Sequence, residues 1–139
     1  MKFQVCAKDS QSEYEKVAAD AIRDRINHSN SSKYSFITFD VAGTQTQVVF
    51  ELFHSIAPRT SDNFFGLCKQ FKNKDGEVIG YGATDIHRIV KGMYIQMGKI
   101  KTKNADCPTS IYSGEFADES FHVKHTEVGL LGMCKRSGL

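Results

Sequence analysis

One stretch decides the fold of this chain: residues 34–53 read YSFITFDVAGTQTQVVFELF. Apolar side chains recur at every second position on both sides of a turn at residues 42–46 that contains Gly43, as half-buried strands require. They are Ile37, Phe39, Val41, Val48, Phe50 and Leu52. Two such runs joined by a short turn predict an antiparallel β-hairpin.

Downstream of the hairpin, the chain carries one helical signal and then two further strand-like runs. Pro58 suits the first turn of a helix, and the apolar stripe of that helix would be Phe64, Leu67, Cys68 and Phe71. The polar residues 72–76 end it. Residues 84–90 and 93–97 are again rich in β-formers around Gly92, and residues 99–108 form a basic, polar loop. The order lacks alternating βαβ units, so it predicts a mainly β (α+β) fold, a barrel with a capping helix.

Upstream of the hairpin, residues 13–27 give the clearest helical signal. Ser12 and Glu15 form a capping box, and apolar residues recur at three- and four-residue steps: Tyr14, Val17, Ala18, Ala21, Ile22 and Ile26. Residues 1–6 suit a short strand, and residues 27–33 read as a polar linker. We therefore predict two parts. The first is an N-terminal extension over residues 1–33 that contains the amphipathic helix, and the second is a separate domain over residues 34–139.

Composition restricts the class of protein. The 139 residues are 40% hydrophobic and 24% charged, which is typical of one globular domain. No apolar run approaches the ~18–20 residues of a membrane span, and a net charge of +2 is too small to indicate nucleic acid or anionic lipid as a partner. Residues 1–30 are charged throughout and lack a signal-peptide pattern. The expected location is cytoplasmic, and nuclear or cytoskeletal association is the alternative left open.

The cysteines and histidines leave several interpretations open. The four cysteines lie far apart and predict small buried hydrophobes in a reducing compartment: Cys6, Cys68, Cys107 and Cys134. A zinc set can be drawn from Cys107, His122, His125 and Cys134, but its spacing fits no usual finger, and histidines that bond the loop backbone are the favoured interpretation. A Cys–His nucleophile has no support from spacing. Lys99, Lys101 and Lys103 alternate and could meet phosphate, although a solvated loop is favoured.

The polar residues that stand out lie in the second pair of strands. His87 and Arg88 interrupt an apolar run, and Gln96 stands between two apolar neighbours. A solvated polar face accounts for this pattern as well as a site does. In the second interpretation, Arg88 and Gln96 share one face of adjacent strands and form, with Met93, a groove with an apolar floor and a fixed cation.

Several stretches together resemble the cyclophilin family. Residues 34–41, 49–53 and 57–65 are similar to its first hairpin and first helix, and His87-Arg-Ile-Val90 with Gly92 and Gln96 is similar to its active-site strands. Further matches follow in the next loop and strand: Ser110-Ile-Tyr112, Phe116, Asp118-Glu119, Phe121, Lys124-His-Thr126, Gly129, Leu131 and Met133. The resemblance covers residues 34–133 and leaves the N-terminal helix outside.

The resemblance implies an eight-stranded antiparallel barrel capped by two helices, and peptidyl-prolyl cis-trans isomerase activity on proline-containing peptides or proteins. No metal or cofactor is implied, because rotation about an X–Pro bond needs only an apolar pocket and a group that favours the twisted amide. Arg88 would be the catalytic residue. The substrate-binding residues would be Met93, Gln96, Ile86 and His87.

The sequence also departs from the family pattern. Met93 stands where the family usually has phenylalanine, Ile86 replaces an aromatic residue, and Lys135 occupies the position of a pocket asparagine. The strands that would close the barrel are missing after Leu139, so we expect a cyclophilin-like barrel that is incomplete at its C-terminus. Its open edges would be completed by the N-terminal segment, a second copy or a protein partner. The alternative function is a binding or structural module of cyclophilin descent with weak or lost turnover.

Overall fold

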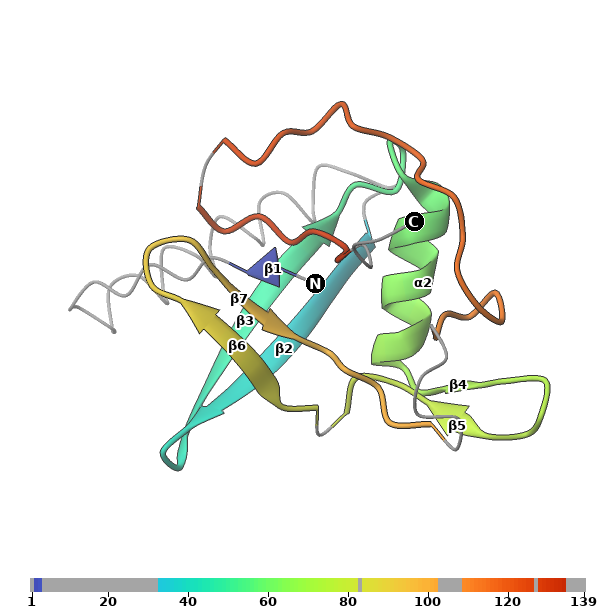
Figure 1. Ribbon diagram of the computed structural model, residues 1–139, viewed down its shortest axis with the longest axis horizontal. Coiled ribbons are helices and arrows are strands. Elements are labelled where there is room, and N and C mark those ends of the chain that lie inside the picture. The colour runs from blue at the N-terminus through green and yellow to red at the C-terminus, as the bar shows by residue number, and fades with distance from the viewer. Residues whose placement is uncertain (1, 4–32, 83, 103–108, 127, 135–139) are drawn as a thin grey trace. The chain divides into compact units, whose positions relative to one another are not determined.

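The computed structural model describes residues 2–3, 33–82, 84–102, 109–126 and 128–134 (Figure 1). These contain one helix, α2 (Pro58–Cys68), and strands β1 (Lys2–Phe3), β2 (Lys33–Val41), β3 (Thr44–Leu52), β4 (Phe71–Lys72), β5 (Val78–Ile79), β6 (Ile86–Val90) and β7 (Tyr94–Met97). The predicted mainly β fold, with its helix after the first hairpin, is confirmed for this part of the chain. The short strand expected within residues 1–6 is β1.

The structure does not test two predictions about the N-terminal region. The helix expected over residues 13–27 lies outside the described residues, and the domain boundary after residue 33 remains a prediction. Within the described ranges, no helix is long and apolar enough to cross a membrane.

The described strands pair into three separate antiparallel sheets rather than one closed barrel. Their strand orders are β1-β7-β6, β2-β3 and β4-β5. The chain also divides into two compact units, Cys6–Phe53 and Met1–Val5 with His54–Leu139. Each unit is described by itself below.

The hairpin of β2 and β3 confirms the period-two pattern, and its turn is shorter than the one predicted from the sequence. The strands pair in continuous register from Lys33 with Leu52 to Val41 with Thr44. Only Ala42 and Gly43 remain in the turn, both at positive φ of 52° and 83°, as the type I′ turn of a two-residue hairpin requires. The side chain of Asp40 accepts a hydrogen bond from the Gly43 N–H at 3.0 Å. The turn is shorter than the predicted residues 42–46 because these two residues reverse the chain alone.

Helix α2 begins at Pro58, as predicted, and buries one face. Phe64 and Leu67 are 3% and 1% exposed, and the Phe64 ring lies 5.5 Å from that of Tyr81. The predicted stripe ended at Phe71, but the helix ends at Cys68 and Phe71 begins β4. The physical reason is Gln70, whose φ of 62° is left-handed and cannot continue an α-helix.

The β4–β5 hairpin is tied to the end of this helix. Of the polar residues 72–76, which were expected to interrupt the chain, Lys72 belongs to β4 and the others lie in the turn. There the Asn73 Oδ1 accepts hydrogen bonds from the N–H groups of Asp75 and Glu77 at 3.0 and 2.8 Å. The N–H of Tyr81 donates to the Leu67 carbonyl at 3.1 Å. Burial, with a smaller contribution from Cys68, raises the pKa of the Tyr81 hydroxyl above its ordinary value. This hydroxyl therefore stays neutral at physiological pH.

Candidate functional site

The turn at residues 91–93 determines which side chains of β6 and β7 face each other. The Met93 N–H donates to the Val90 carbonyl at 3.0 Å, and Gly92 has a φ of 74°, which glycine adopts without strain. The resulting register pairs Val90 with Tyr94, Ile89 with Ile95, and Arg88 with Gln96. Arg88 and Gln96 are thus directly opposite each other on adjacent strands, so their side chains lie on the same face, as predicted.

A β-bulge interrupts this ladder at His87. Regular pairing beyond Arg88 would bring His87 opposite Met97, but the register shifts so that Ile86 takes this place. Met97 is 8% exposed, and a polar imidazole beside it would need a hydrogen-bond partner. The bulge puts an apolar residue there instead, at the cost of one unpaired residue, His87.

The Arg88 guanidinium is exposed and lies over an aromatic ring. Its central carbon is 5.7 Å from the centroid of Tyr94, which occupies the diagonal position on the same face as Gln96. A cation at this distance from a ring is attracted by the negative π-face. Tyr94 therefore restricts the orientation of Arg88 while the N–H donors stay open to solvent.

A thiol from a distant part of the chain completes the cluster. The side-chain amide of Gln96 donates a hydrogen bond to the Sγ of Cys134 at 3.1 Å, across 38 positions of sequence. Cys134 was predicted to be a small buried hydrophobe, and this is wrong, because the residue is exposed. Its sulfur instead acts as a weak acceptor beside Gln96.

The other predicted site residues are distributed around this pair. Ile86 pairs with Met97, the neighbour of Gln96 in β7, so Ile86 lies on the opposite face from Arg88 and Gln96. His87 lies in the bulge. Met93 lies in the turn and is 62% exposed. The structure brings Arg88 and Gln96 together with Tyr94 and Cys134. Tyr94 was not a candidate in the sequence, and Cys134 was considered there only as a zinc ligand or a buried hydrophobe.

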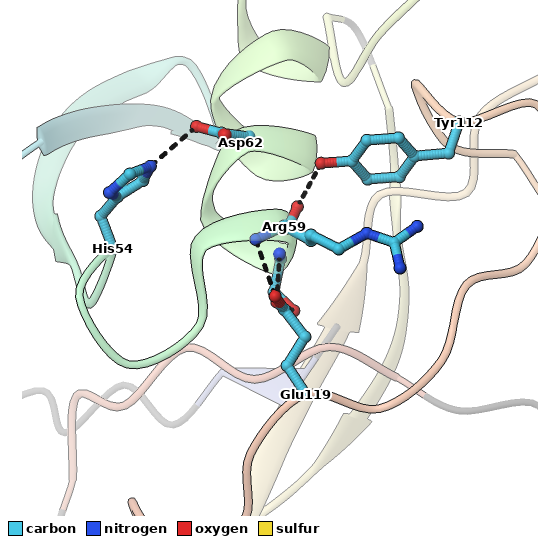
Figure 2. A network of polar contacts seen from close by, with 6 residues as sticks. His54, Arg59, Asp62, Tyr112 and Glu119 are labelled. Carbon is cyan, nitrogen blue, oxygen red and sulfur yellow. Dashed lines mark hydrogen bonds and ion pairs between the residues drawn. The ribbon is translucent and has the colours of Figure 1, made fainter.

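A second polar cluster joins the loop after residue 109 to the start of α2 (Figure 2). One carboxylate oxygen of Glu119 accepts the Arg59 N–H at 2.9 Å, and the other accepts the Thr60 N–H and hydroxyl at 2.6 and 2.7 Å. The hydroxyl of Tyr112 donates to the Arg59 carbonyl at 3.0 Å. Ala57, at the N-cap position, makes no side-chain cap bond, so Glu119 caps this helix from 59 positions away in sequence.

The ionisation of Glu119 follows from these contacts. Burial opposes the charged form and raises the pKa of its carboxyl, but the bonds from the Thr60 hydroxyl and the Thr60 and Arg59 N–H groups, with the Arg59 charge, outweigh it. The pKa of Glu119 is therefore lower than its ordinary value. Since its oxygens are occupied by α2, this cluster is a structural clamp.

The zinc interpretation gains no geometric support from the described residues. His122 and His125 are exposed, Cys107 lies outside the described ranges, and no three possible ligands of the His, Cys, Asp and Glu types come together within those ranges. The imidazole of His125 instead approaches Gly132 so closely that a Cβ there would lie 2.7 Å from its ring.

Comparisons with known proteins point to one family. The model of the family described as cyclophilin type peptidyl-prolyl cis-trans isomerase/CLD matches residues 23–138. Two curated relatives come from Arabidopsis thaliana. Peptidyl-prolyl cis-trans isomerase CYP21-1 is 35% identical over 102 residues, covering 71% of this chain and 46% of the relative. Peptidyl-prolyl cis-trans isomerase CYP22 is 38% identical over 88 residues, covering 63% and 44%. The chain thus spans less than half the length of these relatives.

Proposed function

This chain belongs to the cyclophilin-type peptidyl-prolyl cis-trans isomerase family, and on that premise we propose that it accelerates rotation about X–Pro bonds in proline-containing peptides or proteins. The observation that carries the proposal is the pairing of Arg88 with Gln96 on one face of the β6–β7 hairpin.

The chemistry needs little machinery. Rotation about a peptide bond faces a barrier of about 18–20 kcal/mol because amide resonance is lost in the twisted state. In that state the proline nitrogen regains its lone pair, and a hydrogen-bond donor aimed at it stabilises the transition state more than either ground state. The step transfers no proton or electron and breaks no covalent bond.

We assign the donor role to Arg88. Arginine offers a cationic, planar fork of N–H groups, and the position of Arg88 over the Tyr94 ring limits its freedom before substrate arrives. Gln96, directly opposite, would hold the substrate backbone through its carboxamide.

The remaining predicted residues have supporting roles in this proposal. Met93, exposed in the turn beside this face, would contact the pyrrolidine ring. His87, in the bulge, would contact the substrate. Ile86 would act from the opposite face by supporting the strand against Met97. The N-terminal segment, a second copy of the chain or a protein partner would cover the open sheet edges of the cyclophilin-like barrel that we propose.

An isomerisation assay tests this function. A peptide with one X–Pro bond is incubated with the purified chain, and its cis–trans exchange is followed by NMR exchange spectroscopy. We expect Arg88→Ala to lower kcat/KM by about 10- to 100-fold, less than the ~100- to 1000-fold effect of losing a donor shielded from water, because Arg88 is exposed. Arg88→Lys, which keeps the charge but loses the planar fork, should fall between the two.

Lys124→Ala is the control, because it removes an exposed positive charge from a loop outside the hairpin. Exchange no faster than in peptide alone would refute the activity and leave a binding module. Equal rates for the wild-type chain and Arg88→Ala would refute the assigned mechanism.

A further inference from the structure

A depression of about 230 Å³ lies outside the Arg88–Gln96 pair. It is lined by Gln70, which lies between α2 and β4, by residues of β5 and the segment from β5 to β6, and by residues 99–101 after β7. Figure 1 shows the chain after β7 returning toward β4 and β5. Neither Arg88 nor Gln96 lines it, so its chemistry is separate from that of the proposed isomerase site.

Two cations border this depression without an ion-pair partner in the described part of the chain. Lys99 and Lys101 both line it and are both exposed. Two ammonium groups at the rim of one hollow repel each other, and an anion placed between them removes this repulsion and adds two attractions. Of the two interpretations of this lysine series, solvated loop or phosphate contact, the shared depression favours contact with an anion.

The opposite wall supplies an amide and closely approaching backbone. Gln70 holds a left-handed φ of 62°, a strained conformation for a residue other than glycine. Its side-chain nitrogen would lie 3.4 Å from a Cβ at Gly82, so the absence of a side chain at residue 82 leaves room for that amide. At Gly80, a Cβ would meet the Leu67 carbonyl oxygen at 2.7 Å, so only glycine lets this wall pack on the helix end.

The size and the remaining lining limit the occupant. Val78 and Ile100 give the depression an apolar part. Its volume of about 230 Å³ equals that of roughly seven or eight liquid water molecules and lies below the usual range for drug-sized ligands. The space suits one compact anionic head with a short apolar body.

We propose that this depression binds the dianionic head of a phosphate monoester. Such a head carries about −1.5 to −2 charge at neutral pH and three strong acceptor oxygens, which matches two lysines and one carboxamide. A carboxylate carries half that charge, and its planar geometry is matched best by arginine. Lysine is a point charge and suits the rounder phosphate group.

Phenyl phosphate titrated into the 15N-labelled full chain tests the proposal. We expect saturable shifts of the amide signals of Gly82, Ile100 and Lys101, and at least tenfold weaker binding to the double variant Lys99→Gln/Lys101→Gln, equivalent to ~1.4 kcal/mol. Phenyl sulfate and benzoate, with one negative charge each, should bind at least threefold more weakly than phenyl phosphate.

Lys124→Gln is the matched control, since it removes an exposed lysine that does not line the depression. Shifts that do not saturate, an unchanged affinity of the double variant, an equal loss in Lys124→Gln, or benzoate binding as tightly as phenyl phosphate would each overturn the proposal.

Free O-phosphoserine and a phosphoserine peptide then distinguish a small phosphate ester from a phosphorylated protein segment. Equal affinities assign the site to the small ester, and tighter binding of the peptide assigns it to the segment. Because every readout is binding, the result does not depend on isomerase activity.

Discussion

Glu119 caps helix α2 from a distant loop, and its removal should destabilise the unit that contains both. Its carboxylate accepts hydrogen bonds from two backbone N–H groups and one hydroxyl. Loss of a helix cap costs about 0.5–2 kcal/mol, and a hydrogen bond to a charged group contributes about 1.5–3 kcal/mol. Since Glu119 is only partly buried, we expect Glu119→Gln to lower the free energy of unfolding by about 2 kcal/mol at pH 7.

The stabilisation by Glu119 should depend on pH, and the direction follows from its pKa. The pKa of Glu119 is depressed in the folded state, so its stabilisation is complete above the unfolded pKa of about 4.3. It disappears as pH falls through the lower, folded pKa, where the folded chain also takes up the proton. The difference between wild-type and Glu119→Gln should therefore be largest at neutral pH and shrink below about pH 4.

Urea unfolding followed by far-UV circular dichroism, repeated from pH 7 to pH 3, measures this difference. Amide hydrogen exchange at Arg59 and Thr60 gives a local readout, and both amides should exchange faster in Glu119→Gln. The matched control is Glu115→Gln, which changes an exposed glutamate of the same loop and should leave stability unchanged. A Glu119→Gln variant as stable as the wild-type chain at pH 7, or a difference that stays constant down to pH 3, would refute the capping argument.

Two further predictions concern the hairpin turn and the thiol beside Gln96. Ala42→Asn should raise the free energy of unfolding by about 0.5–1 kcal/mol, because Asn tolerates the left-handed φ of 52° better than Ala and Asn-Gly favours this turn; thermal unfolding would show it, and an unchanged or lower midpoint would contradict it. Cys134→Ala should lower isomerase kcat/KM about threefold, since the Gln96 amide loses an acceptor at 3.1 Å worth about 0.5–1 kcal/mol. Cys68→Ser is the control, and equal activity of Cys134→Ala and wild type would exclude this role.

Local patterns predicted most of the described elements. Alternation in residues 34–53 predicted β2 and β3, and Pro58 predicted the start of α2. Gly92 marked the turn between β6 and β7. These features could be predicted because a strand or helix start depends on side chains within a few positions of each other.

The arrangement of the candidate site was less accessible. Two adjacent polar residues, His87 and Arg88, break the alternation of β6, and this break was the available signal for the bulge. No comparable signal marked Cys134 or Glu119, whose partners lie 38 and 59 positions away. Such contacts depend on the path of the loops, which periodicity does not encode.

The sequence by itself determined the β2–β3 and β6–β7 hairpins, the start of α2 and the family to which the chain belongs, because each depends on residues that are near one another or on a recurring motif. It did not predict the β4–β5 hairpin, since Phe71 was expected in the helix. Only the tertiary structure decided that Arg88 faces Gln96 and lies over Tyr94, that Cys134 accepts from Gln96, and that Glu119 caps α2. The physical reason is that strand register and long-range hydrogen bonds follow from how turns and loops close, and a one-residue difference in register changes which side chains meet.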